Sequence, residues 1–421
     1  RTVHTGLLEY KNVYRPARVI SYNKESGELV LHNYMDFDDL KDYVKISYEL
    51  TQDGLVISKG ILPEFSVAPH GEGKTNLKIN VPENGKCYLK LIYHLKKELP
   101  LLDEDHILGF DEIEVSKEDT KCKLAEKWIP KTVVDSELQV NENDTQIHIK
   151  GREFAYTIDK RTALFTEMKF AGREYLNHPM ELNIWRAPTD NDMYIKSEWK
   201  KAHYDKAYTR AYTTEVVQGK HGVKITSHAS VVAETVQKIL DVTITWKIEA
   251  AGKIDADIAV TKDDEFPDLP RFGVRMFLDK KLSAARYFGM GPQESYCDKH
   301  QAASHGLYQA NVDDLHEDYI RPQENGSHYD CEYVELNNSR YGIVASAEKA
   351  FSFNASYYTQ EELEKKTHNY ELTESDSVVF CVDYALNGIG SNSCGPVVLE
   401  QYRFDDVLFR FQFTLIPYVK G

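Results

Sequence analysis

The segment VTITWKIEAAGKIDADIAV, residues 242–260, decides the fold of this chain. Apolar side chains alternate with polar ones on both sides of a central turn, at positions 242, 244, 246 and 248 before it and 254, 256, 258 and 260 after it. A period of two is that of a β-strand with one buried face, and Gly252 suits the turn. The segment therefore predicts an antiparallel β-hairpin.

The same period marks the first part of the chain. Alternating runs flank the turn at residues 23–27, and the dipeptide Asp53-Gly54 separates two further runs in a hairpin pattern. Later runs cover residues 77–81, 87–95 and 107–115. About seven short strands in about 115 residues are typical of an immunoglobulin-like or fibronectin-like sandwich. Residues 1–115 are therefore predicted to form such a domain.

The remainder of the chain is also predicted to be β. Residues 116–133 are polar and charged, which indicates a linker or, equally, a solvated edge of the first sandwich. The alternation resumes at Leu138 and continues to residue 415, with helical patterns only near 197–207 and 360–366. A small barrel could not contain so many strands. Residues 134–421 are therefore predicted to form one large domain of two packed antiparallel sheets. The predicted fold class is all-β.

Composition narrows the function classes. The 421 residues carry 51 basic and 67 acidic side chains, and the net charge of −16 disfavours nucleic acid and anionic membranes as partners. No apolar run approaches the roughly 18–20 residues that span a bilayer. The six cysteines show no C-x-x-C pair or zinc spacing, so free thiols and no metal site are expected. We expect a cytoplasmic protein, with the periplasm also compatible, and the start at Arg1 suggests a fragment, a processed chain or a trimmed one.

The stretch Trp185-Arg186-Ala187-Pro188-Thr189-Asp190-Asn191-Asp192 is the first candidate site. An indole face and planar guanidinium, carboxylate and amide groups are what sugar rings and hydroxyls need. Two interpretations stand. Asp190 and Asp192 bind a sugar or a cation, or they cap a turn or the start of a helix beside the rigid Pro188.

A second candidate site is the loop at residues 319–328. Planar hydrogen-bonding side chains converge there around a proline and a glycine, namely Arg321, Gln323, Glu324, Asn325 and His328. Such a loop on a rigid scaffold is a common place for function, but an internal network that satisfies buried polar groups explains it equally well. The glycine-containing segments 289–296 and 387–396 lack the context of a nucleotide-binding loop and are predicted to be turns.

Several separated motifs together resemble one family. They are Arg1–His4, Val67–Pro69, Trp185–Asp192, Gly289–Tyr296, Pro322–Gly326 and Gly388–Gly390. In order and approximate spacing they are similar to the C-terminal part of the large, lacZ-like β-galactosidases of glycoside hydrolase family 2. The resemblance covers essentially the whole chain. It implies that residues 1 to about 115 are the second sandwich domain of such an enzyme and that residues from about 134 are its supersandwich, a fold similar to galactose mutarotase.

The resemblance also implies a function. The family hydrolyses terminal β-galactosides with retention, using two glutamates that sit on a (β/α)₈ barrel. No alternating β/α pattern is found in this chain, so we expect it to hold no catalytic residue and to be inactive alone. Its expected role is to wall or buttress the sugar pocket through Trp185, Arg186, Asp190, Asn191, Asp192, Trp199, Arg321, Glu324, Asn325 and His328.

Partners and cofactors follow from the same resemblance. We expect the catalytic barrel domain and a galactoside as partners, a homo-oligomer for the parent enzyme, and Mg²⁺ and Na⁺ sites on the barrel rather than in this chain. Two alternatives remain. The chain is a separate small subunit or carbohydrate-binding module, or it is an aldose-mutarotase-like isomerase that uses His328 and Glu324 as acid and base.

Overall fold

The structure is a computed structural model that describes residues 3–117, 121–128, 138–390 and 395–420. The chain divides into two compact units. Unit 1 is Arg1–Leu124 with Phe288–Gln293 and His300–Tyr308, and unit 2 is the rest. The boundary after Leu124 falls inside the predicted linker 116–133, of which residues 118–120 and 129–133 lie outside the described residues. The described part contains no helix long and apolar enough to cross a membrane.

Unit 1 contains two antiparallel sheets. One has the order β1-β2-β5 and the other the order β4-β3-β6-β7. One cluster of buried apolar side chains joins them, with Leu29 and Leu31 from the first sheet and Leu50, Leu89 and Leu91 from the second. The prediction of about seven strands is confirmed by β1 (Ala17–Tyr22), β2 (Glu28–Asn33), β3 (Val44–Gln52), β4 (Leu55–Ile61), β5 (Glu72–Asn76), β6 (Cys87–Leu95) and β7 (Ile107–Glu114).

One predicted strand of unit 1 is wrong. The alternating residues Leu77, Ile79 and Val81 pack against the core but join no ladder, and the strand lies just before them, at β5. Apolar alternation reports a buried face of an extended segment, and it does not distinguish a paired strand from an unpaired one. The two short helices α1 (Thr5–Val13) and α2 (Leu40–Tyr43) were not predicted.

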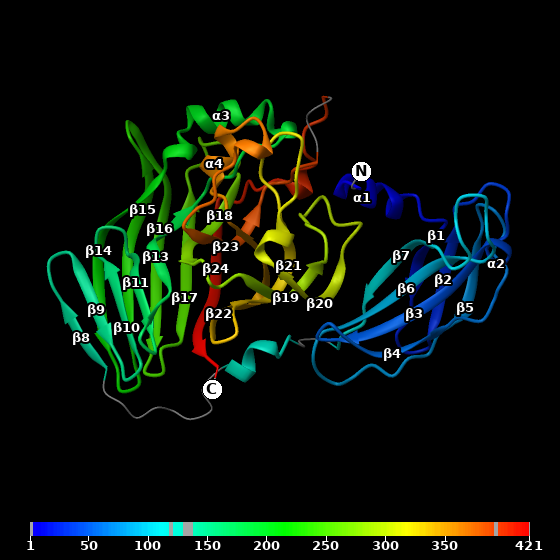
Figure 1. Ribbon diagram of the computed structural model, residues 1–421, viewed down its shortest axis with the longest axis horizontal. Coiled ribbons are helices and arrows are strands. Elements are labelled where there is room, and N and C mark those ends of the chain that lie inside the picture. Colours follow the sequence, from blue (N-terminus) through cyan, green and yellow to red (C-terminus); the bar gives the residue numbers. More distant parts are fainter. Residues whose placement is uncertain (1–2, 118–120, 129–137, 391–394, 421) are drawn as a thin grey trace. The chain divides into compact units, whose positions relative to one another are not determined.

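Unit 2 is built mainly from strands (Figure 1). A five-stranded sheet has the order β12-β11-β10-β9-β8. Its strands are β8 (Gln139–Glu142), β9 (Gln146–Lys150), β10 (Phe154–Asp159), β11 (Leu164–Phe170) and β12 (Arg173–Glu174). Helix α3 (Ile195–Lys201) and helix α4 (Gln360–Lys365) lie where helical patterns were predicted. The all-β prediction is confirmed.

The larger sheet has the order β13-β18-β23-β22-β24-β17-β16-β15-β14, with β19, β20 and β21 branching from it, and residues 288–291 of β19 and 304–308 of β20 are counted with unit 1. The segment 242–260 forms the β16–β17 hairpin, in which Ile248 pairs with Ile254 and Trp246 with Ala256. The strands are β13 (Leu176–Asn183), β14 (Tyr208–Gln218), β15 (Gly222–Ala233), β16 (Val236–Glu249), β17 (Ile254–Lys262), β18 (Arg271–Asp279), β19 (Ala284–Gly291), β20 (Ser304–Asn311), β21 (Ser327–Asn337), β22 (Tyr341–Ser356), β23 (Ser377–Leu386) and β24 (Leu408–Val419).

Strand β22 changes its partner along its length. Its residues 341–346 pair with β24, whereas residues 352–356 pair with β23. Between these two parts of β22, at residues 347–351, the strand pairs with neither β23 nor β24. The end of β23 and the beginning of β24 therefore have no strand between them. This opening in the large sheet positions the cavity described below.

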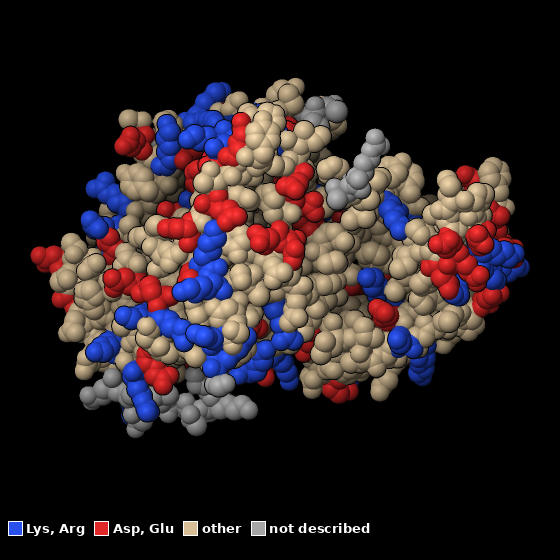
Figure 2. Space-filling view, viewed as in Figure 1, with Lys and Arg blue, Asp and Glu red and all other residues tan. Residues whose placement is uncertain are grey.

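The surface charge is mixed in sign, and the described cysteines match the sequence analysis. Acidic and basic side chains are interspersed over the face seen in Figure 2. Among the described residues, Cys87, Cys122, Cys297, Cys331 and Cys381 are free thiols, as predicted. Cys394 lies outside the described residues.

Candidate functional site

Arg186 is the centre of the first candidate site. It follows β13, its side chain has no exposed surface, and its guanidinium forms a two-pronged ion pair with Asp192. Nε lies 3.1 Å from Oδ2 and Nη2 lies 2.7 Å from Oδ1. Nη1 also donates to the carbonyl oxygen of Asn387, and Nη2 donates to that of Gly388. Arg186 therefore ties the motif to a segment about 200 residues further along the chain.

The two aspartates of the motif have different roles. Asp192 is buried, and its Oδ2 accepts a hydrogen bond of 2.9 Å from the backbone N–H of Thr189, which caps the short 3₁₀ turn Asp190–Asp192. The capping interpretation is confirmed for Asp192. Asp190 is exposed at the surface and forms two hydrogen bonds with the Gln323 amide. Its backbone N–H donates to Gln323 Oε1 at 3.0 Å, and its Oδ2 accepts from Gln323 Nε2 at 3.1 Å. Asn191 donates to the Ile389 carbonyl at 2.6 Å.

The two tryptophans form the packing around Arg186. Both are buried, and their ring centroids lie 6.2 Å apart in an edge-to-face arrangement. The indole N–H of Trp199 donates to the carbonyl of Asp268 at 2.8 Å, and the Arg186 guanidinium lies 5.1 Å from the Trp199 ring centroid. Because neither ring presents an open face to solvent, neither offers a sugar a stacking platform, and Trp199 instead packs against Arg186.

The second loop docks on the first through Glu324. One carboxylate oxygen of Glu324 accepts from the Ala187 N–H at 3.1 Å, and the other accepts from Arg271 at 2.8 Å. Arg271 also pairs with Asp383, and all three groups are buried. Burial raises the pKa of Asp383 to about 6, although the Arg271 charge opposes this rise.

The other residues of the 319–328 loop are mostly internal. Asn325 donates to the Gln323 carbonyl at 2.9 Å and accepts from the Glu317 N–H at 3.0 Å. His328 is 1% exposed, and its ring packs against those of Tyr287 and Phe353, which also contact each other. Arg321 is exposed. The burial of His328 and Glu324 and the engagement of both Glu324 oxygens give no support to an acid–base pair for isomerisation.

Sequence analysis named both loops as separate candidates, did not predict that they meet, and missed three of the partners. Arg271 begins strand β18, which also contains Arg275 and Asp279, Asp383 lies in the mostly apolar strand β23, and Gln323 was seen only as part of the loop. A charged residue within an apolar strand is itself a signal, because a buried charge needs a partner. The pairing could not be read, since Arg271 and Asp383 are 112 positions apart. Among the described residues, no group of His, Cys, Asp or Glu could hold a metal ion.

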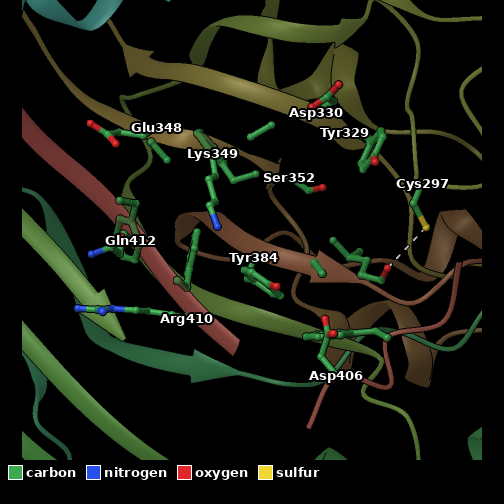
Figure 3. A pocket seen from close by; sticks show the side chains of 18 of the residues that line it. Cys297, Tyr329, Asp330, Glu348, Lys349, Ser352, Tyr384, Asp406, Arg410 and Gln412 are labelled. Carbon is green, nitrogen blue, oxygen red and sulfur yellow. Dashed lines mark hydrogen bonds between the residues drawn. The ribbon is translucent and has the colours of Figure 1, made fainter. Parts of the chain in front are cut away.

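A cavity of about 760 Å³ opens in unit 2 where β22 leaves β24 (Figure 3). Its walls come from β16, β17, β21, β22, β23 and β24 and from segments near residues 296–297 and 401–406. In Figure 3 Tyr384 lies near the middle, with Arg410 and Gln412 on one side and Tyr329 and Cys297 on the other. Sequence analysis did not predict this site, because its side chains come from segments that are far apart in the chain.

The buried network and the cavity are neighbours. Leu386 lines the cavity, and the next residue, Asn387, receives the hydrogen bond from Arg186. Cys297 also lines it, and its thiol donates to the Leu386 carbonyl at 3.7 Å. Burial raises the pKa of the Cys297 thiol to about 12, so it stays protonated and unreactive near neutral pH. The network thus holds one rim of the cavity in place.

Two protein-family models match this chain. The family model for the β-galactosidase small chain matches residues 150–415. The chain belongs to this β-galactosidase family. A second model, for domain 4 of β-galactosidase, matches residues 29–116, which lie in unit 1. The two matches together cover both candidate loops and all seven strands of the sandwich except β1.

Individual relatives agree with the family. The chain is 42% identical over 419 residues to a β-galactosidase of Actinobacillus pleuropneumoniae and 30% identical over 420 residues to one of Staphylococcus xylosus. Each match covers 99% of this chain but only 40% and 41% of the relative, so the chain spans about two fifths of their length. A solved galactose 1-epimerase from Lactobacillus acidophilus NCFM is also similar, at 8% identity and a TM-score of 0.36, covering 68% of this chain and 99% of that one.

Proposed function

We propose that this chain is the C-terminal, non-catalytic part of a β-galactosidase that hydrolyses terminal β-D-galactosides with retention, and that it supports one side of the sugar pocket. The observation that carries the proposal is the 42% identity to a β-galactosidase over 99% of the chain. In this proposal the acid and the nucleophile belong to a catalytic barrel domain, which this chain contacts. Mg²⁺ and Na⁺, where the enzyme uses them, are assigned to that barrel.

The state of the buried carboxylates supports a non-catalytic role. Both oxygens of Glu324 are engaged, and Glu294 accepts from Lys299 at 2.5 Å, from the Gly326 N–H at 2.8 Å and from Tyr319. A glycosidase needs two carboxyl groups that reach one sugar bond, about 5–10 Å apart. Carboxylates that are buried and held by internal donors instead stabilise the two loops. The proposal also includes a homo-oligomeric, cytoplasmic enzyme, with the periplasm as the alternative compartment.

Two assays test the proposal. The 421-residue chain alone is expected to release no product from a chromogenic β-galactoside. Turnover that one Glu→Gln substitution abolished would contradict the non-catalytic role. In the second assay, this chain replaces the matching region of the Actinobacillus pleuropneumoniae enzyme. The chimera is expected to be active, and an inactive but folded chimera would count against the proposed support role.

The chimera also separates support from chemistry. Asp192→Asn weakens the pair with Arg186, so we expect a lower melting temperature or a higher KM, with residual turnover retained. Asp190→Ala removes an exposed contact to Gln323 and is expected to change KM little. A folded, substrate-binding Asp192→Asn chimera with no turnover at all would instead place Asp192 in the chemistry.

A further inference from the structure

We propose that the cavity between β23 and β24 is a binding site for a neutral saccharide, and that this chain binds the saccharide without a barrel domain. The inference goes beyond the proposed function, because it concerns a site whose walls all belong to unit 2. A volume of about 760 Å³ lies within the roughly 300–1,000 Å³ of small-molecule sites.

The aromatic side chains give the cavity a rigid wall. The ring of Tyr384 stacks on Phe409, with centroids 4.8 Å apart and planes 16° apart. Phe404 and Phe411 lie 5.8 and 6.1 Å from the same ring. The packing holds Tyr384 in one orientation, so a ligand that contacts it pays little side-chain entropy. An amphipathic ring with a hydroxyl at its edge suits the mixed polar and C–H surface of a sugar.

Two polar groups of the cavity lack protein partners. In the described part of the chain, neither the Tyr384 hydroxyl nor the Asp406 carboxylate has a hydrogen-bond partner. Figure 3 shows the Tyr384 hydroxyl on the side of the ring that faces Asp406. Partial burial raises the pKa of both groups, and the Asp406 charge adds to the rise for Tyr384. A donor and an acceptor so placed match neighbouring hydroxyls of a sugar.

A forked ion pair lies on another side of the cavity. Arg410 Nε donates to Asp257 Oδ1 at 2.6 Å, and its Nη2 donates to Oδ2. Arg410 keeps 63% of its side-chain surface exposed and Asp257 keeps 21%, so the pair retains donors and acceptors for a ligand. The two residues are fixed to each other across β17 and β24, which keeps these groups in a constant geometry.

The charge of the lining selects a neutral ligand. The walls contain four basic side chains, from Lys247, Lys349, Arg403 and Arg410, and five acidic ones, from Asp255, Asp257, Asp330, Glu348 and Asp406. Because four positive and five negative charges nearly cancel, the cavity offers no strong field to a phosphate or a carboxylate. A polyhydroxylated ligand uses both signs equally.

An added β-strand is the main competing occupant, because β22 no longer bridges β23 and β24 here. The rings of Tyr384 on β23 and of Phe409 and Phe411 on β24 contact each other across this opening. A further strand would lie about 4.8 Å from each neighbour and would have to separate these contacting rings. The side-chain filling therefore favours a small ligand over a peptide.

The test is a titration of the 421-residue chain with lactose, cellobiose and maltose. Saturation-transfer NMR and calorimetry measure the binding. At least one neutral disaccharide is expected to bind, and galactose 6-phosphate is expected to bind more weakly than galactose. No binding of any of the three up to about 50 mM, or tighter binding of the phosphorylated sugar, would overturn the proposal. The result does not depend on hydrolysis, so it separates this inference from the proposed enzymatic function.

Two variants place the saccharide in this cavity. Asp406→Ala and Arg410→Ala change exposed side chains, and each is expected to weaken binding about tenfold, the scale of one hydrogen bond to a charged group. The matched control is Arg161→Ala, because Arg161 forms the same forked pair with Asp159 and is 76% exposed on another part of unit 2. Unchanged binding in both cavity variants, or an equal loss in the control, would refute the assignment. Thermal melts confirm that all three variants fold.

Discussion

Arg186 and Asp192 show how much depends on one buried pair. Neither side chain has more than 5% of its surface exposed to solvent, and every described contact of the guanidinium is with another group of this chain. A buried pair adds little net stability compared with an apolar replacement of both members, but removal of one member leaves an uncompensated charge. The pair therefore acts mainly to specify how residues 185–192 meet residues 387–388.

Arg186→Met tests this role at the residue scale. The substitution leaves Asp192 buried without its partner and frees two carbonyl oxygens, so we expect the free energy of unfolding to fall by about 3–5 kcal/mol. Urea denaturation followed by circular dichroism measures the change. Arg161→Ala breaks a forked pair in which Arg161 is 76% exposed and Asp159 is 10% exposed, and it is expected to have a smaller effect because solvent reaches one member of the pair. If both variants lost the same free energy of unfolding, the burial of Arg186 would not explain its contribution to stability.

His316 predicts a pH dependence. Burial lowers its pKa, although Asp318 opposes the shift, and its Nε2 lies 3.6 Å from Asp318 Oδ1. The folded state therefore disfavours the charged imidazole. As the pH falls below about 6.5, the unfolded chain binds this proton first, and the contribution of His316 to stability is lost.

His316→Asn is expected to reduce that loss. The free energy of unfolding, measured by urea titration at pH 7.5 and at pH 5.5, should fall less between the two values in the variant than in the wild type. Parallel stability curves for the two proteins would show that His316 is not one of the groups responsible.

At the scale of the elements, β18 and β23 must approach each other closely. Gly273 lies in β18 at an irregularity of the ladder, and a Cβ there would collide with the Val382 carbonyl and the Asp383 carboxylate. The absent side chain lets Asp383 turn towards Arg271. Gly273 therefore makes room for the buried ion pairs that Arg271 forms with Asp383 and Glu324.

Gly273→Ala is expected to separate β18 from β23 and to lower the free energy of unfolding by about 1–3 kcal/mol, as overpacking does. Thermal denaturation gives the measurement. Gly219→Ala is the control, because a Cβ at Gly219 meets only the Gly222 carbonyl, at 3.5 Å, an ordinary contact. If Gly273→Ala melts at the temperature of the control, the close approach is not required.

At the scale of the whole molecule, unit 1 is not a continuous stretch of chain. Residues from the later part complete it: the Gln301 carbonyl accepts from Asn12 at 2.8 Å, and His305 Nδ1 lies 2.7 Å from Glu112. The ring of His305 also stacks on Tyr88, with centroids 4.0 Å apart. These contacts bury polar groups that residues 1–124 alone would leave exposed.

A fragment of residues 1–124 is therefore expected to be less stable than unit 1 in the whole chain. Hydrogen exchange of the amides of β6 and β7 compares the two states, and faster exchange is expected in the fragment. His305→Ala in the whole chain should move the same amides in the same direction by a smaller amount. Equal protection in fragment and chain would show that residues 1–124 form a complete domain.

The sequence by itself predicted the all-β class, most strands of unit 1, the hairpin at 242–260 and, as separate candidates, the two polar loops at 185–192 and 319–328. These depend on local features: a period of two, turn residues and a dense run of polar groups. It also indicated the family, through motifs that lie in six separate places. The strand expected at 77–81 failed because the same alternation serves an unpaired extended segment.

Only the tertiary structure decided which groups pair and where a ligand can enter. Arg186 reaches residues 201 and 202 positions away, and the cavity combines strands from residue 247 to residue 414. Many antiparallel strands have equivalent alternation, so local pattern cannot choose among possible neighbours. The choice is made when buried charges must find partners and when β22 divides its pairing between β23 and β24, and both conditions exist only in the folded chain.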